Sequence, residues 1–139
     1  MSGIYIHIPY CKQACHYCDF HFSTSMKTKH EMIDSIVKEI EIRSSEFSQN
    51  IDSIYIGGGT PSVMTNFELE AIFIALEKKI SIGKIKEITI EINPEDLLSE
   101  KLDFYKKIGI NRLSIGIQSM NNDVLKWMNR IHDKNQVVK

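Results

Sequence analysis

The sequence lacks two features that would assign the chain to broad functional classes. It has no basic excess, because 17 Lys and Arg residues face 18 Asp and Glu residues and the net charge is -1. A sequence-independent nucleic-acid binder needs such an excess to displace counterions from phosphates, so we expect no nucleic-acid partner. No apolar run approaches the roughly 18 residues that span a bilayer, so we expect membrane contact only through a partner protein.

Leader-like and disordered segments are also missing. Residues 1–9 carry no basic stretch ahead of an apolar one, which gives no sign of a secretory signal. Ile, Leu, Val and Phe are abundant and the net charge is near zero, which argues against intrinsic disorder. The 139 residues, 42% hydrophobic and 25% charged, have the composition of one globular domain or part of one. We therefore expect a cytoplasmic location in a reducing compartment.

Cysteine is scarce, and its placement is informative. The three cysteines are Cys11, Cys15 and Cys18, and a fourth is absent. An odd number within so short a segment cannot form a disulfide framework. Clustered thiols in a reducing compartment bind metal or carry out chemistry. Thiolates are the usual ligands of iron–sulfur clusters, and three of them leave one iron of a four-iron cluster open to a small molecule.

A zinc-binding or degenerate structural domain is the alternative from a different class. Zinc prefers a closed tetrahedral ligand set, usually built from paired C-x2-C and H-x3–5-H spacings. No second pair of that kind is present, and the histidines that could complete the site are His7, His16 and His21. Bound iron and sulfide would distinguish a cluster from zinc.

Short isoleucine-rich segments alternate with helical segments along the chain. The pattern predicts strands over residues 3–8, 51–56, 87–92 and 112–117. Apolar residues at helical spacing predict helices over residues 28–43, 66–80 and 100–108, and a fourth from about Asn122. Thr28 with Glu31 and Thr65 with Glu68 match the capping box, and Gly109 suits the end of the third helix.

The succession of strand, helix and strand predicts a parallel sheet with right-handed crossovers. Within each strand, isoleucines alternate with polar or small residues, as Ile6 and Ile8 do with His7. Side chains point to opposite faces with period two, so one face packs on helices and the other is polar. A closed barrel fills its interior with bulky branched residues. We therefore expect an α/β fold of parallel (β/α) repeats in a curved, open sheet that holds a ligand; a sheet with one solvated face is the alternative.

The loops that follow parallel strands meet at one edge of the sheet, where α/β folds build their sites. The cysteines follow the first strand, and Gly57-Gly58-Gly59-Thr60-Pro61 follows the second. Consecutive glycines permit close approach of a ligand, and their amides can form a nest for a carboxylate or a cofactor edge; a tight turn is the alternative. Glu91 and Gln118 are inward-facing polar groups at the ends of the third and fourth strands. Together they favour ligand contact over a structural role.

Two further sets of residues have open interpretations. Arg130 and His132 are expected on the fourth helix, as ligand contacts or as part of a solvated face. Tyr5, Tyr17 and Phe20 flank the cysteine segment, and their rings could pack over a cluster, over an adenine or in the core.

The combination of motifs resembles a known family. Cys-x3-Cys-x2-Cys followed by a glycine loop after the next strand resembles the radical S-adenosylmethionine superfamily. Six longer stretches of the sequence resemble one family within that superfamily, the oxygen-independent coproporphyrinogen III oxidase family. The matching stretches are YIHIPYC from Tyr5, YCDF from Tyr17, GGGTP from Gly57, EINP from Glu91, RLSIGIQS from Arg112 and RIH from Arg130.

The resemblance implies a radical-SAM-type, TIM-like barrel and two cofactors. Cys11, Cys15 and Cys18 would ligate a [4Fe–4S] cluster whose open iron chelates the amino and carboxylate groups of S-adenosylmethionine. One electron from the cluster would then cleave that molecule to a 5′-deoxyadenosyl radical. The positions that surround S-adenosylmethionine in the family match Tyr5, Tyr17, Gly58, Gly59, Thr60, Glu91, Gln118 and Arg130.

One departure discriminates within the family. Coproporphyrinogen oxidases carry a further cysteine two residues after the third, where this chain has Phe20. That pattern resembles the HemW branch, which implies a heme chaperone that binds heme or porphyrin and delivers heme to a receiving protein. The decarboxylating oxidase of porphyrin biosynthesis is the alternative. Because the superfamily barrel has six strands and four are predicted here, residues 1–139 are expected to be the N-terminal portion of a longer barrel domain.

Overall fold

A computed structural model describes residues 2–47 and 51–138. The strands are β1 (Ser2–Ile8), β2 (Ile51–Gly58), β3 (Glu87–Ile92) and β4 (Arg112–Ile115). The α-helices are α1 (Lys29–Ile42), α2 (Asn66–Glu77), α3 (Ser99–Lys107), α4 (Asn122–Trp127) and α5 (Lys134–Val138). Short 3-10 turns are η1 (Arg43–Glu46), η2 (Pro61–Val63), η3 (Ile82–Lys84) and η4 (Pro94–Asp96).

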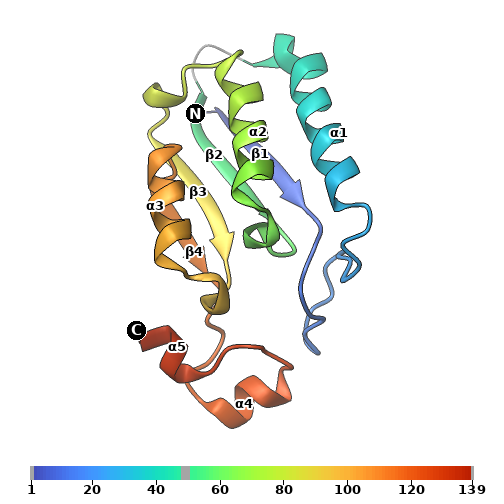
Figure 1. Cartoon of the computed structure of the whole chain (residues 1–139), viewed down its shortest axis with the longest axis vertical. Coiled ribbons are helices and arrows are strands. Elements are labelled where there is room, and N and C mark those ends of the chain that lie inside the picture. The colour runs from blue at the N-terminus through green and yellow to red at the C-terminus, as the bar shows by residue number, and fades with distance from the viewer. Residues whose placement is uncertain (1, 48–50, 139) are drawn as a thin grey trace.

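The four strands in the described part of the chain form one parallel sheet in the order β1-β2-β3-β4. Ile6 pairs with Ile56, Ile56 with Ile90, and Ile90 with Leu113, so apolar side chains form a row across the sheet. The helices α1, α2 and α3 lie on the same side of this sheet (Figure 1). The predicted α/β arrangement of parallel strands and helices is therefore confirmed.

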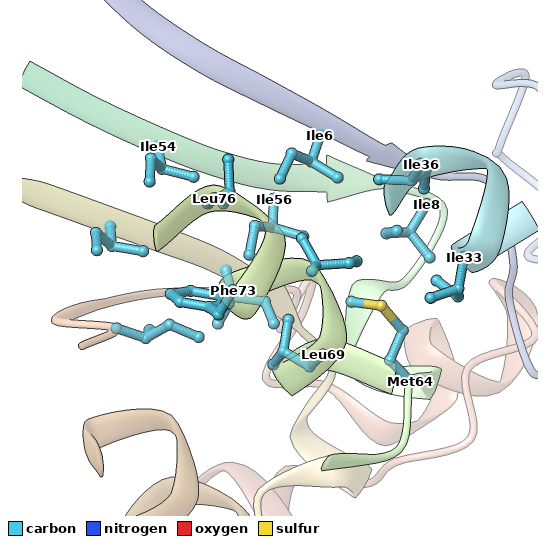
Figure 2. Packing of buried hydrophobic residues seen from close by; sticks show 14 of the residues in the cluster. Ile6, Ile8, Ile33, Ile36, Ile54, Ile56, Met64, Leu69, Phe73 and Leu76 are labelled. Carbon is cyan, nitrogen blue, oxygen red and sulfur yellow. The ribbon is translucent and has the colours of Figure 1, made fainter. Parts of the chain in front are cut away.

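The hydrophobic core lies between the sheet and these helices. Isoleucines of β1 and β2 face α1 and α2, and Met64 fills the space at the start of α2 (Figure 2). The labelled side chains come from Ile6, Ile8, Ile33, Ile36, Ile54, Ile56, Met64, Leu69, Phe73 and Leu76. Burying one such side chain contributes about 1.5–3 kcal/mol, so this single face supplies most of the apolar stabilisation.

The two predicted capping boxes have different outcomes. The Thr65 hydroxyl accepts from the Glu68 amide at 3.2 Å and the Glu68 carboxylate accepts from the Thr65 amide at 2.8 Å, which confirms the box of α2. The box of α1 is wrong, because Thr28 makes no side-chain cap. Its hydroxyl lies 3.0 Å from the Tyr10 hydroxyl instead. A tertiary contact has replaced the local one.

Several element ends differ from the predicted ones. The strand β4 ends at Ile115 and α2 ends at Glu77, both earlier than expected. Gly109 has φ +99° two residues after α3, which confirms it as a helix-ending residue. Among the described residues, no helix has both the length and the apolar character that crossing a bilayer requires.

Candidate functional site

The segment after β1 folds back on itself and presents all three cysteines at the carboxyl edge of the sheet. We call residues 9–23 the cysteine loop. The Cys11 amide donates to Ser23 O at 3.0 Å, the Ser23 amide donates to Pro9 O at 2.8 Å, and the Cys18 amide donates to Cys15 O at 3.1 Å. The three thiols are half-buried and form no disulfide.

The glycine loop after β2 packs directly against the cysteine loop. The Gly59 amide donates to Ile8 O at 2.9 Å, and the Thr60 amide donates to Tyr10 O at 2.7 Å. A Cβ on Gly59 would lie 2.8 Å from Tyr10 O and 2.9 Å from Cys11 Sγ, which is too close for any side chain. Glycine is needed here because two pieces of backbone and a thiol meet.

Two of the thiols receive hydrogen bonds from neighbouring loops. Thr60 Oγ1 lies 3.3 Å from Cys11 Sγ, and Arg130 Nη1 lies 3.5 Å from Cys15 Sγ. Burial raises the pKa of the Cys11 thiol and the nearby Cys18 and Cys15 add to that effect, while Thr60 and Arg130 act in the opposite direction. The surroundings therefore contain donors suited to a sulfur that carries negative charge.

The Glu91 carboxylate lies on the polar face of the sheet with both of its oxygens engaged. Tyr55 donates its hydroxyl to Glu91 Oε1 at 2.7 Å, and the Gly58 amide donates to Oε2 at 3.1 Å. The bond to Glu91 raises the pKa of Tyr55, with burial adding to it. Of the predicted amide nest, only the Gly58 amide bonds a carboxylate, that of Glu91, because the Gly59 and Thr60 amides donate to Ile8 O and Tyr10 O.

Arg130 and His132 lie between α4 and α5, not on the fourth helix as predicted. Arg130 Nη2 donates to Gly116 O at 2.8 Å, and its Nε is buried with no hydrogen-bond partner among the described residues. His132 is buried, which rules out the solvated-face interpretation. The helix α4 ends at Trp127, before either residue, and Asn129 takes a left-handed conformation with φ +60° that does not continue a helix.

Buried His132 connects two loops. Its Nε2 lies 3.0 Å from Ile117 O, and its Nδ1 lies 3.4 Å from Glu95 Oε2, close enough for an ion pair but outside hydrogen-bond geometry. Gln118, the residue after Ile117, has φ +65°, a conformation that non-glycine residues rarely adopt. It lies beyond the end of β4 rather than at a strand end.

Eleven of the residues predicted for the site line one open cavity of about 470 Å³ at the carboxyl edge of the sheet, whereas His132, also a candidate ligand contact, is buried and does not line it. The eleven residues are Tyr5, Cys11, Cys15, Tyr17, Cys18, Gly58, Gly59, Thr60, Glu91, Gln118 and Arg130. The segment from α4 to α5 lies beyond the carboxyl ends of the strands (Figure 1). The sequence did not predict the side-chain contacts of Tyr55 with Glu91 and of Asn93 with Thr60 and Arg130.

Tyr5, Tyr17 and Phe20, the three rings with open interpretations, lie outside the core, and Tyr5 is 59% exposed. Tyr17 is 44% exposed and Phe20 is 78% exposed, and both border the cavity. The core-packing interpretation of these rings is therefore wrong. Among the residues that the structure describes, no three His, Cys, Asp or Glu side chains are arranged to hold a single metal ion.

Comparisons with known proteins show which family the chain resembles. The family model described as the Radical SAM superfamily matches residues 5–139. The chain is 41% identical over 139 residues to the heme chaperone HemW of Buchnera aphidicola subsp. Schizaphis graminum, covering 98% of this chain and 37% of that protein. It is 33% identical over 140 residues to the heme chaperone HemW of Bacillus subtilis, covering 99% of this chain and 37% of that one.

A solved structure has the same fold. The coproporphyrinogen III oxidase HemN of Escherichia coli, described as a radical SAM enzyme, superposes with a TM-score of 0.86 at 28% identity. The match covers 98% of this chain and 32% of that one. The chain therefore spans a little over a third of the length of the curated relatives it matches.

Proposed function

This chain belongs to the radical SAM superfamily, and on that premise we propose that Cys11, Cys15 and Cys18 ligate one [4Fe–4S] cluster. The observation that carries the proposal is the common exposure of these three thiols to one cavity, with donors from Thr60 and Arg130 on two of the sulfurs. The superfamily implies this cluster and S-adenosylmethionine as cofactors. When bound, the cluster supplies a coordination position for a small molecule and a source of single electrons.

The thiol surroundings fit such a cluster. Hydrogen bonds from N–H and O–H groups to ligand sulfurs are a recurring feature of iron–sulfur sites. The missing Cβ of Gly59 leaves space beside Cys11 Sγ that any other residue would fill. We expect anaerobic reconstitution with iron and sulfide to load the protein, with stoichiometric zinc and no labile sulfide as the contrary result.

We propose that S-adenosylmethionine occupies the remainder of the cavity. The residues around it would be Tyr5, Tyr17, Gly58, Gly59, Thr60, Glu91, Gln118 and Arg130. The placement of these residues around one open cavity that also contains the three thiols supports this assignment. Adding S-adenosylmethionine to the reduced cluster should alter its electron paramagnetic resonance spectrum. An unchanged spectrum would contradict the assignment.

For the longer protein whose N-terminal portion this chain would form, we propose the activity of a heme chaperone in the cytoplasm. It would bind heme and pass it to a receiving protein, and it would contact a membrane only through such a partner. Curated relatives that carry the name heme chaperone HemW support this, as does Phe20 at the position where the oxidases carry cysteine. Heme titration of a protein extended to the length of its relatives should give a stoichiometric absorption change.

Coproporphyrinogen III oxidation is the second candidate, and the superposition on HemN favours it. The two candidates differ in one product. Anaerobic incubation of the extended protein with coproporphyrinogen III, reductant and S-adenosylmethionine should yield no protoporphyrinogen IX if the chaperone proposal holds. Product formed at a catalytic rate would reverse the ranking.

A further inference from the structure

We propose that Asn93 is a positioning residue that fixes the hydrogen bonds on two ligand sulfurs and thereby raises the reduction potential of the cluster. The inference rests on the proposed ligation by Cys11 and Cys15. The hydrogen bonds of the Asn93 side chain go to Thr60 and Arg130, not to a sulfur, among the described residues. It acts through Thr60 and Arg130, the two side chains that donate to them.

The Asn93 side chain bridges both of these donors. Arg130 Nη2 donates to Asn93 Oδ1 at 2.7 Å, while Asn93 Nδ2 lies 3.4 Å from Thr60 Oγ1. The residue directly follows β3, between the glycine loop on one side and the β4 loop on the other. One amide group therefore links the loops after β2 and β3 to the segment between α4 and α5.

The chemistry of the groups fixes the direction of this chain of hydrogen bonds. An arginine can only donate, so the amide oxygen of Asn93 must face Arg130 and its NH2 group must face Thr60. The Thr60 oxygen then accepts from Asn93, and its single proton is free to point at Cys11 Sγ. Without Asn93, the Thr60 hydroxyl could rotate, and Arg130 Nη2 would keep only one of its two acceptors, Gly116 O.

The bridge is held firmly from its own loop. Asn93 O accepts from the Asp96 amide at 2.9 Å. The buried Asp96 carboxylate accepts from Ser62 Oγ at 2.5 Å and from Lys12 Nζ, the residue after Cys11. A Cβ on Gly116 would lie 2.9 Å from Asn93 Oδ1, so the opposite loop leaves room for the amide and no more.

These contacts predict a definite sign for the effect on potential. Reduction adds negative charge to the cluster and its sulfurs, and hydrogen bonds to the sulfurs stabilise the reduced form. Removing the orienting amide weakens both bonds and lowers the potential. For Asn93→Leu, which keeps the size and removes both polar atoms, we expect the one-electron reduction equilibrium to fall by about tenfold, a midpoint lower by about 59 mV.

The experiment is an anaerobic redox titration followed by electron paramagnetic resonance, preceded by iron and sulfide analysis of each variant. Asn93→Leu is compared with Thr60→Val, which removes one donor without changing shape, and with the double variant. Because Asn93 acts through Thr60, the double variant should shift less than the sum of the two single shifts. The matched control is Asn66→Leu, at an exposed asparagine in the first turn of α2, which should leave the potential unchanged.

Each outcome decides something. A wild-type protein that loads no cluster overturns the proposed ligation itself. A loaded Asn93→Leu protein with the wild-type midpoint, or with fully additive shifts, overturns the role of Asn93 alone. If Asn93→Leu fails to load, the smaller Asn93→Ser replaces it, and if neither loads, Thr60→Val decides, because a wild-type midpoint in that variant contradicts the chain of hydrogen bonds.

Discussion

The two faces of the sheet are built for different tasks. On the helix side, Ile54, Ile56 and Ile90 have no exposed surface and pack against α1 and α2. On the other side and at the carboxyl edge, the cavity is lined by thiols, a carboxylate and a guanidinium. Glu91 and the buried isoleucines come from the same strands, because alternate side chains point in opposite directions, whereas the thiols and the guanidinium come from segments outside the strands.

The difference shows where stability and chemistry reside. The apolar face depends on close packing, so a loss of side-chain volume there lowers the free energy of unfolding. The polar side depends on directional contacts between loops, such as Thr60 to Cys11 and Tyr55 to Glu91. Substitutions should therefore separate into those that lower unfolding free energy and those that alter the site.

Removal of a ligand thiol should have the largest effect on the site and little effect on the core. Cys11→Ala, Cys15→Ala or Cys18→Ala leaves two thiolates where the cluster needs three, so we expect the visible absorption of the reconstituted protein to disappear. Urea unfolding of the unloaded protein should change little, because the thiols are only half-buried. Retention of a full cluster by any of these variants would break the assignment.

A pair of glycine substitutions tests whether the site needs the close approach of the glycine loop to the cysteine loop. The new methyl group in Gly59→Ala would collide with Tyr10 O and Cys11 Sγ and displace the cysteine loop, so we expect cluster loading to fall several-fold. In Gly83→Ala the methyl group meets open space, and loading should match the wild type. Iron and sulfide per chain measure both, and equal loading would show that the close approach of the loops is unimportant.

An isoleucine pair tests the packed face. Ile90→Ala removes a side chain with 0% exposure, and we expect a loss of about 2–5 kcal/mol in unfolding free energy. Ile115→Ala removes one that is 40% exposed beside the cavity, so its loss should be well below that range. Urea titrations of the two unloaded variants provide the measurement. Similar losses of unfolding free energy would mean that the helix-covered face contributes no more to stability than the cavity side does.

The smallest expected effect concerns the helix starts. Thr65→Ala removes a complete capping box from α2 and should cost about 1 kcal/mol. Thr28→Ala removes no cap from α1, only a hydroxyl contact with Tyr10, so thermal unfolding should shift less. If Thr28→Ala lowers the unfolding temperature more than Thr65→Ala does, the contact between Thr28 and Tyr10 of the cysteine loop stabilises the protein more than the capping box of α2.

The sequence was sufficient to predict features that depend on local pattern. The isoleucine alternation gave the strands and their buried face, and Thr65 with Glu68 gave the start of α2. The rule that parallel strands end at one edge predicts that Cys11, Glu91 and Gln118 lie around one site, and all three line the cavity. These predictions succeed because each follows from periodicity or from one fixed topological rule.

The contacts that organise the site could not be predicted, because they join residues distant in sequence. The sequence around Thr28 matches a capping box, but in the structure the Thr28 hydroxyl contacts the Tyr10 hydroxyl and caps no helix. Arg130 reaches the cavity only because the chain leaves the helical path at Asn129. The hydrogen bonds of Asn93 to Thr60 and Arg130 depend on how three segments distant in sequence lie relative to one another, which no local sequence pattern predicts.

The measurement that tests the account most directly is the metal and sulfide content of the anaerobically reconstituted protein. If the carboxyl edge of the sheet holds a cluster on three cysteines, iron and acid-labile sulfide should each approach four per chain, as a cubane requires. The triple variant with Cys11, Cys15 and Cys18 replaced by alanine should contain neither. One zinc per chain without sulfide in the wild-type protein would contradict the central claim.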